Sequence, residues 1–530
     1  MSISDDVLPP GKLALLPGSV RPAAILNGRD GFSPMGAAMF ELTSEALADQ
    51  LAADPQQWVH AYSVDTGDPI DVVAARSPIE RSSQFSWGPI IEVYPASRYP
   101  FGERIVIVIS MPDNAAVPDD YAAPARELSE AAWQLLEHND IAAQSVVTAT
   151  EYTIASAESV LGEHERGQAA ITDFDYPIEI VRTLYYRKGH VAAKVKGRVL
   201  LPDFRGEDGL VNVNNDAQAN AQWIPFDLYL PRSARKASAP VMIYGHGITA
   251  NRYTSIFVHR QNARHGIATL AIDQPNHGSR ISIDGYSVFQ VLRTDRLPRA
   301  LGMVMQSAFD LHGLTSMIEK QLHTVDALPK KIWGRSGDGI PDIDTSRILY
   351  SGTSLGGVLG SGFAAFDDRV DGVYLQVSGT GIARIMTHSS FWGLGFKNLI
   401  SREFTAGETA FQAMLTQHVV DMVEGGMRAE SYNRETKPLF IQYGLDDTVA
   451  TNASTFSLAG IAGLQLNPPV LADVPGMPVN GVYDPLMGVL QVEPVVRKGW
   501  LHGFTAHTTF IKSQAIDAYR QWLDAINARW

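Results

Sequence analysis

Short apolar runs separated by Gly- and Pro-rich turns dominate the first part of the chain. Three of these runs, "WVHAYSV", "PIIEVYP" and "RIVIVISMP", alternate or carry β-branched residues in the way that predicts strands. The stretch "ELSEAAWQLLEH" has helical spacing instead, with Ser129 placed as an N-cap, and "SVVTATEYTIAS" then resumes the strand pattern. We therefore predict a β-rich accessory domain over residues 1–165.

The pattern changes in residues 166–530. "EIVRTLYYRKGHVAAKVKGRVLLP" predicts antiparallel strands, and after it the apolar runs "VMIY", "IATLAI", "RILYSG", "GVYLQVSG" and "LFIQYG" alternate with helical stretches. Such alternation predicts a parallel sheet covered by helices on both faces, which is the α/β class. Because ligands of open sheets bind beyond the carboxyl ends of the strands, we expect the chemistry at the turns that follow these runs.

One of these turns holds a candidate nucleophile. Ser354 lies in "GTSLG", a G-x-S-x-G spacing that follows the strand-like "RILY" and precedes the small-residue run "GGVLGSGFAAF". A serine on so sharp a strand-to-helix turn has strained dihedrals, and side chains at Gly352 or Gly356 would collide with neighbouring backbone. The alternative is a tight turn that serves packing alone.

The order of residues along the chain favours the catalytic alternative, because an acid and then a histidine follow the serine. In "LFIQYGLDDTVAT" we prefer Asp447 to its neighbour Asp446 as the acid, the alternative for either being a helix N-cap. In "VVRKGWLHGFTAH" we prefer His502 as the base, because His507 stands closer to the last helix and is a candidate cap for it. His502 would take the proton of Ser354 and then give it to the leaving group.

The turn after "VMIY" supplies a candidate oxyanion hole. It reads Gly-His-Gly-Ile, so the backbone N–H of Ile248, or that of Gly247, is expected to act together with the N–H of Leu355. His246 is expected to organise this loop by hydrogen bonding. In the next turn, "LAIDQPNHGSR", Asp273 is expected to tie loops together, with His277 bordering the substrate pocket.

A helical insertion between two of the predicted strands, at about 382–436, stands where a cap over the serine is expected. Its residues Phe391, Trp392 and Phe396 are candidates to line an acyl pocket or, equally, to pack the insertion against the core. The aspartates of "GRSGDGIPDID" resemble half of a calcium loop but lack the EF-hand spacing and its closing glutamate, so we predict a surface turn and no metal site.

Composition narrows the function classes. The formal net charge of -14 is spread along the chain without a basic block, which argues against nucleic acid as a partner. The absence of cysteine excludes thiol catalysis and thiolate metal sites. The sequence contains no apolar run of about 18 residues, so it predicts no transmembrane segment, and its start has no signal-peptide pattern.

Taken together, these motifs resemble those of the α/β-hydrolase superfamily, and within it those of bacterial virulence-factor lipase-type hydrolases. The residues that carry this resemblance are "NGRDGFSP", "PASRYPFGERIVIVIS", "GHGITANR", "MQSAFDLHGL", "GTSLGG" and "GLDDTV". The resemblance implies an N-terminal β-rich domain, a Ser-Asp-His hydrolase domain at 166–530, and ester, lipid or polyester substrates. Members are commonly exported or lipid-anchored, whereas this sequence shows neither signal, so localisation stays open.

The resulting hypothesis is a serine hydrolase that cleaves carboxylic esters through an acyl-enzyme without a cofactor. A serine peptidase or amide hydrolase uses the same set of residues, because pocket shape selects the leaving group. A binding protein that keeps a hydrolase fold without activity is the third alternative. The sequence leaves the oligomeric state open.

Overall fold

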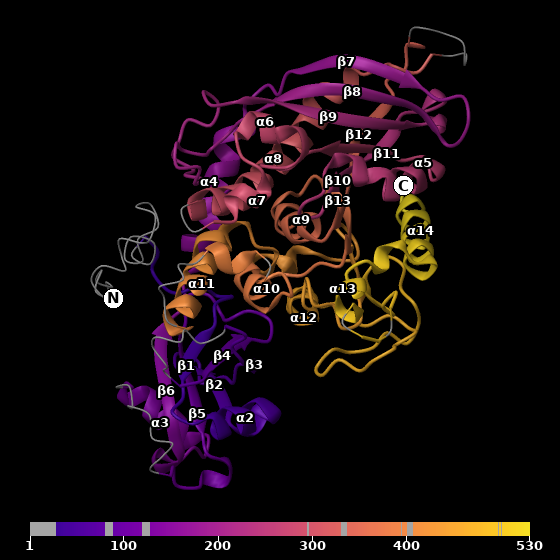
Figure 1. The fold of residues 1–530 in the computed structure, drawn as a ribbon. Coiled ribbons are helices and arrows are strands. Elements are labelled where there is room, and N and C mark those ends of the chain that lie inside the picture. The colour runs from indigo at the N-terminus through magenta and orange to yellow at the C-terminus, as the bar shows by residue number, and fades with distance from the viewer. Residues whose placement is uncertain are drawn as a thin grey trace. The chain divides into compact units, whose positions relative to one another are not determined.

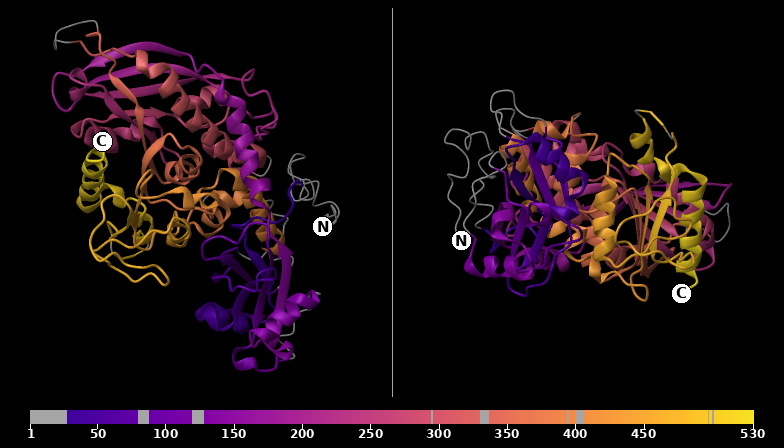
Figure 2. Two further views of the ribbon diagram at one scale, coloured as in Figure 1. Left: turned by 180° about the vertical axis from the view of Figure 1, so that it is seen from behind. Right: turned by 90° about the horizontal axis from the view of Figure 1, so that it is seen from below.

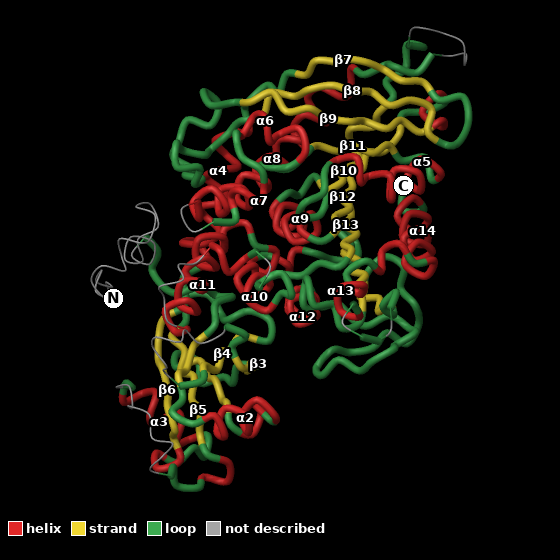
Figure 3. Tube along the Cα trace, viewed as in Figure 1, coloured by secondary structure: helices red, strands yellow, loops and turns green. Residues whose placement is uncertain are grey.

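The structure is a computed structural model, and it describes residues 28–79, 88–118, 128–293, 296–329, 337–393, 395–399, 406–496, 498–499 and 501–530. The chain forms two compact units. The first comprises 1–163, 293–297 and 381–422, and the second comprises 164–292, 298–380 and 423–530. Figure 1 labels the elements of both, and Figure 3 separates helices from strands by colour. No helix within the described ranges is long and apolar enough to cross a membrane.

The first unit contains two antiparallel sheets, as the alternating runs near the N-terminus predict. One has the order β1-β4-β3 and the other β2-β5-β6. Their strands are β1 (Ala38–Glu41), β2 (Val59–Ser63), β3 (Val72–Arg76), β4 (Ile90–Pro95), β5 (Arg104–Ser110) and β6 (Val146–Thr153). The helices are α2 (Glu45–Ala53), α3 (Glu130–His138), α10 (Ile382–His388) and α11 (Ala406–Val420), and α4 (Ala157–Thr172) runs across the boundary to the second unit.

The boundary between the two units passes through the predicted helical insertion, which differs from the division that the sequence predicts. We expected about 382–436 to form part of the hydrolase domain, whereas 381–422 packs with the N-terminal residues in the first unit. Specific polar contacts explain this, because Glu92 of β4 binds His388 of α10 at 2.7 Å. Likewise, Ser33 donates to the carboxylate of Asp421 at 2.9 Å. Such partners, remote in sequence, leave no local signal.

The second unit is built on a nine-stranded sheet with the order β7-β8-β9-β11-β10-β12-β13-β14-β15. Strands β7 to β9 and the β9–β11 pair are antiparallel, and the pairs from β11 through β15 are parallel. The strands are β7 (Ile178–Tyr185), β8 (Val191–Leu201), β9 (Gln222–Pro231), β10 (Ala239–Gly245), β11 (Ala268–Ile272), β12 (Ile343–Thr353), β13 (Val370–Gln376), β14 (Leu439–Gly444) and β15 (Gly488–Val492). Figure 2 shows this sheet from behind and from below.

Helices cover both faces of the parallel part of the sheet, which confirms the predicted α/β class (Figure 1). Alternate residues of one strand point to opposite faces, so Ile243 packs with α8 and α9 whereas Met242 packs with α5 and α14. The helices of this unit are α5 (Ile256–Arg264), α6 (Ile281–Asp284), α7 (Val288–Val291), α8 (Leu297–Gln321), α9 (Leu355–Phe366), α12 (Asn452–Ile461), α13 (His502–Ala506) and α14 (Ser513–Asn527).

Candidate active site

Ser354 occupies the turn between β12 and α9. Its backbone adopts φ 54° and ψ -122°, a conformation that costs a residue with a side chain about 1–3 kcal/mol. The turn is held because the Ser354 N–H donates to the carbonyl of Gln376 in β13 at 2.9 Å, and the Gly357 N–H donates to the Ser354 carbonyl at 2.7 Å. The serine is half-buried. The strand, strained turn and helix expected from the sequence are therefore present.

The glycines on either side of the serine are required by close backbone approach. A Cβ atom on Gly352 would overlap the carbonyl group of Gly356, and one on Gly356 would overlap the carbonyl group of Gly245 in β10. Neither glycine has a positive φ, so space alone excludes a side chain at these positions. This confirms the predicted reason for the G-x-S-x-G spacing.

His507 lies between Ser354 and an acid. Its Nε2 atom is 2.7 Å from the Ser354 Oγ, and its Nδ1 atom is 2.8 Å from the Oδ2 of Asp447. Since a carboxylate only accepts hydrogen bonds, Nδ1 carries the proton in this arrangement and Nε2 is left to accept from the serine hydroxyl. Ser354, His507 and Asp447 thus form a continuous chain of hydrogen bonds in which the serine can lose its proton to the ring.

Asp447 is oriented by the turn that follows β14. Its Oδ1 accepts from the backbone N–H groups of Val449 at 2.8 Å and Ala450 at 3.2 Å, which leaves Oδ2 for the histidine. The side chain is 1% exposed. Its neighbour Asp446 has a positive φ of 60° and a side chain that is 74% exposed. Of the two aspartates weighed from the sequence, Asp447 is the one that reaches the ring beside Ser354.

The choice of histidine made from the sequence is corrected by the structure. The Nε2 atom of His502 is 2.9 Å from Asp446, and its Nδ1 atom is 3.0 Å from the carbonyl of Val496. Helix α13 separates the two histidines: His502 begins it and His507 is its C-cap residue. The backbone of Ala506 packs directly over Gly444 at the end of β14, where a Cβ atom would overlap it. That contact places the C-terminal end of α13 at the end of the strand, whereas the start of α13 packs against the following turn at Asp446 and Thr448.

The proposed oxyanion loop lies beside the serine. A Cβ atom on Gly247 would be 3.3 Å from the Ser354 Cβ and 3.7 Å from its Oγ, so the two backbones are in close contact. Leu355 is the first residue of α9, where an N–H has no partner inside the helix. Within the described residues, the Ile248 N–H donates to no other group. The roles of Gly247, Ile248 and Leu355 in holding an oxyanion remain predictions.

The His246 side chain holds the proposed oxyanion loop through two hydrogen bonds. The Gln274 N–H donates to its Nε2 at 3.0 Å, and its own Nδ1 therefore donates to the Gly247 carbonyl at 2.9 Å. Burial, together with the nearby ring of His277, lowers the pKa of His246 to about 4. The ring is fully buried and neutral at neutral pH, so it organises the loop as the sequence analysis expected.

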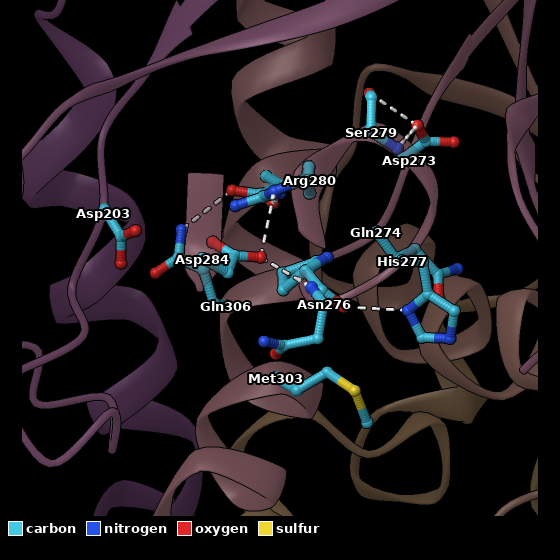
Figure 4. A network of polar contacts seen from close by, with 12 residues as sticks. Asp203, Asp273, Gln274, Asn276, His277, Ser279, Arg280, Asp284, Met303 and Gln306 are labelled. Atoms are coloured by element: carbon cyan, nitrogen blue, oxygen red, sulfur yellow. Dashed lines mark hydrogen bonds and ion pairs between the residues drawn. The ribbon is translucent and has the colours of Figure 1, made fainter. Parts of the chain in front are cut away.

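Asp273 ties the loops after β10 and β11 together. Its carboxylate accepts from the Arg252 N–H at 2.8 Å. It also accepts from the Ser279 N–H at 2.7 Å and from the Ser279 hydroxyl at 2.8 Å (Figure 4). Burial by itself raises the pKa of Asp273, but these donors and the charge of Arg252 more than offset it, and the pKa lies below its usual range. The predicted linking role of Asp273 is confirmed.

His277 is buried in the same loop. Its Nδ1 donates to the Pro275 carbonyl at 2.8 Å, and burial lowers the pKa of the ring (Figure 4). The Nε2 atom has no hydrogen-bond partner among the described residues. That His277 and His246 border a substrate pocket remains a prediction.

The aromatic residues suggested for an acyl pocket belong to the first unit. The rings of Phe391 and Phe396 are 6.4 Å apart, and Trp392 packs against the buried side chains of Ile79 and Ile90. All three aromatic side chains are half-buried. Their part in binding substrate remains a prediction.

In the acidic loop before β12, aspartate carboxylates accept hydrogen bonds from backbone N–H groups. Asp342 accepts from the N–H of Ala327 at 2.6 Å, and Asp344 accepts from the N–H of Ser346 at 3.1 Å. Burial raises the pKa of Asp342 to about 6. Across the described parts of the chain, no group of three or more acidic or histidine side chains is placed to hold a metal ion.

The strand order, the helices on both faces and the serine turn at the end of β12 define the α/β-hydrolase fold. Neither a protein-family model nor a curated protein matches the chain. Among solved structures, acetyl xylan esterase 1 from Thermoanaerobacterium sp. is 12% identical, with a TM-score of 0.41 over 69% of this chain and 93% of that chain. The acetyl xylan esterase from Paenibacillus sp. is 15% identical, with a TM-score of 0.41 over 69% and 94%. A glucuronoyl esterase from Teredinibacter turnerae is 16% identical, with a TM-score of 0.37 over 70% and 86%.

Proposed function

We propose that this protein is a serine hydrolase that cleaves carboxylic esters through an acyl-enzyme, with Ser354 as nucleophile, His507 as base and Asp447 as the acid that orients it. The observation that carries the proposal is the unbroken chain of hydrogen bonds from Ser354 Oγ through the His507 ring to Asp447. A second observation supports it: the serine is kept on a strained turn, and such strained backbone is concentrated at active sites.

In the first half-reaction His507 Nε2 takes the hydroxyl proton while the Ser354 Oγ attacks the ester carbonyl carbon. The carbonyl oxygen becomes an oxyanion, and in this proposal the N–H groups of Leu355 and of Ile248 or Gly247 stabilise it by a few kcal/mol. His507 then gives its proton to the alkoxy oxygen, the carbon–oxygen bond breaks, and the alcohol leaves. Asp447 stabilises the imidazolium while the ring carries two protons.

In the second half-reaction a water molecule acts as the nucleophile in place of the serine. His507 takes a proton from the water, the resulting hydroxide attacks the acyl carbon, and the proton is returned to Ser354 Oγ as the acyl bond breaks. The products are a carboxylic acid and a regenerated serine, so the sequence of steps balances without a cofactor. We further place the natural substrates among lipid-like or polyester esters, as the motifs that resemble virulence-factor lipases imply, with Phe391, Trp392, Phe396, His246 and His277 as candidate pocket residues.

The test is covalent labelling of the purified protein with a fluorophosphonate, followed by identification of the labelled peptide. We expect one label on Ser354, loss of labelling and of ester turnover in Ser354→Ala, and no change in the control Ser346→Ala, which alters an exposed serine on the same strand. Labelling that persists in Ser354→Ala would refute the assignment. Matched ester and amide substrates then separate an esterase from an amide hydrolase.

A further inference from the structure

Arg384 is a buried cation in the first unit. It lies on α10 and is 7% exposed. The guanidinium carbon stands 4.6 Å from the centre of the Tyr94 ring, so the planar group stacks on an aromatic face. An arginine keeps its charge in proteins, and a buried charge is costly unless it is paired and hydrogen-bonded.

No such partner exists for Arg384 in the part of the chain that the structure describes, where it makes neither a hydrogen bond nor an ion pair. Two other arginines behave differently: Arg205, whose side chain is 11% exposed, binds Asp203 at 2.6 Å, and Arg369, whose side chain is 30% exposed, binds Asp367 at 2.7 Å. Burial tends to lower the pKa of all three, but the carboxylates beside Arg205 and Arg369 more than offset it, whereas the pKa of Arg384 stays below its usual value. The attraction of Tyr94 and Glu92 offsets only part of this effect of burial on Arg384, so its charge is only partly matched inside the protein.

The carboxylate of Glu92, which attracts the charge of Arg384, is already engaged by other donors. Glu92 accepts from the Ser77 hydroxyl at 2.5 Å, from the Tyr94 hydroxyl at 2.8 Å and from His388 Nε2 at 2.7 Å. Although burial raises the pKa of Glu92, these donors and the His388 charge lower it below its usual value. Glu92 thus holds Tyr94 in place, and Tyr94 holds the plane of the guanidinium. The donors of Arg384 are oriented in advance and remain unused.

We propose that Arg384 anchors a carboxylate-binding site in the first unit, with the Tyr94 ring as its wall. The planar fork of a guanidinium matches the two oxygens of a carboxylate, and a bidentate pair of this kind satisfies both the charge and the donors. A monoanion fits better than a dianion such as phosphate, because the ionised Glu92 carboxylate adds negative charge nearby. The site does not depend on the proposed hydrolysis, and it admits a carboxylate from a substrate, a product or another small molecule.

The first experiment is calorimetric titration of the full chain with butyrate, using uncharged butyramide and inorganic phosphate as comparison probes. We expect butyrate to bind and to raise the thermal midpoint, with butyramide inactive and phosphate weaker by about tenfold or more. Arg384→Lys keeps the charge but loses the fork, and it should weaken butyrate binding by about tenfold. Absence of butyrate binding to the wild-type chain would overturn the proposal.

A second measurement tests whether the buried charge of Arg384 destabilises the protein when no ligand is bound. Arg384→Met keeps the length of the side chain, so without ligand it should raise the thermal midpoint by about 2 °C, while abolishing the shift that butyrate causes. Arg98→Met is the matched control, because Arg98 also stacks on an aromatic ring in this unit, at 4.3 Å from Phe101, but is half-buried. A lower midpoint in Arg384→Met together with unchanged butyrate binding would show that Arg384 is a structural residue.

Two further arms complete the design. Ser354→Ala should bind butyrate as the wild type does, so a failure of the hydrolase proposal leaves this measurement intact. With the active protein, esters that carry a free carboxylate and matched neutral esters distinguish the sources of the ligand. A KM that rises in Arg384→Met for the charged ester alone assigns the site to substrate, whereas equal KM values assign it to a separate small molecule.

Discussion

The assignment of His507 as the base predicts opposite outcomes for two histidines only a few residues apart. Glutamine is the replacement in both cases, because it keeps polar atoms near the ring positions but cannot act as a base at neutral pH. We expect His507→Gln to lower kcat/KM for a chromogenic ester by about 10⁴-fold, the scale seen when one member of such a triad is removed. We expect His502→Gln to lower it by less than about tenfold.

These magnitudes follow from the contacts of each ring. His507 Nε2 is 2.7 Å from the nucleophile, within the range required for proton transfer, so its loss removes the base from the reaction. A 10⁴-fold loss corresponds to about 5.5 kcal/mol of barrier. His502 binds Asp446 and the Val496 carbonyl at a more exposed position, and an exposed pair contributes about 1 kcal/mol or less. Its replacement acts only through the position of α13.

The assay is the initial hydrolysis rate of p-nitrophenyl butyrate by the two variants and the wild type, after their thermal midpoints have been compared. Fluorophosphonate labelling of the same samples reports the serine separately from turnover. The reasoning is refuted if a folded His502→Gln loses as much activity as His507→Gln, or if His507→Gln retains a tenth of the wild-type rate.

Three further outcomes are expected. Asp447→Asn should lower kcat by about 10³–10⁴-fold and the neighbouring Asp446→Asn by less than about tenfold, both measured with the same ester, because only Asp447 contacts His507. Gly356→Ala should abolish activity and lower the thermal midpoint, because its methyl group would overlap the Gly245 carbonyl; normal activity would contradict this. Since burial lowers the pKa of His246 to about 4, the unfolded chain takes up that proton first as the pH falls, so stability is lost below about pH 6.5. By pH 5 this contribution is about 2 kcal/mol, and urea unfolding should show a loss smaller by this amount in His246→Asn than in the wild type, because other buried histidines such as His259 contribute in both.

Local sequence patterns were sufficient for the sheet and for two of the three polar residues of the site. Short apolar runs such as "VMIY" and "LFIQYG" predict buried parallel strands because each strand must present apolar side chains to helices on both faces. The G-x-S-x-G spacing marks the serine because close backbone approach leaves no space for side chains at Gly352 and Gly356. Asp447 is predicted because it lies in the turn that directly follows a predicted strand. Each of these signals lies within a few residues of the position it predicts.

The histidine and the packing of the insertion depended on contacts between residues far apart in sequence. His502 and His507 stand in one loop without a periodic pattern, and the contact of Ala506 with Gly444 decides which of them reaches the serine. The insertion packs with the N-terminal sheets through pairs such as Glu92 and His388. The pattern of residues within a short segment predicts a strand or a turn because the geometry of these elements is local. The contact partner of a side chain, in contrast, is set by the free energy of packing the whole unit. The sequence alone therefore determined the strands and the serine turn, and only the tertiary structure decided which imidazole meets the hydroxyl.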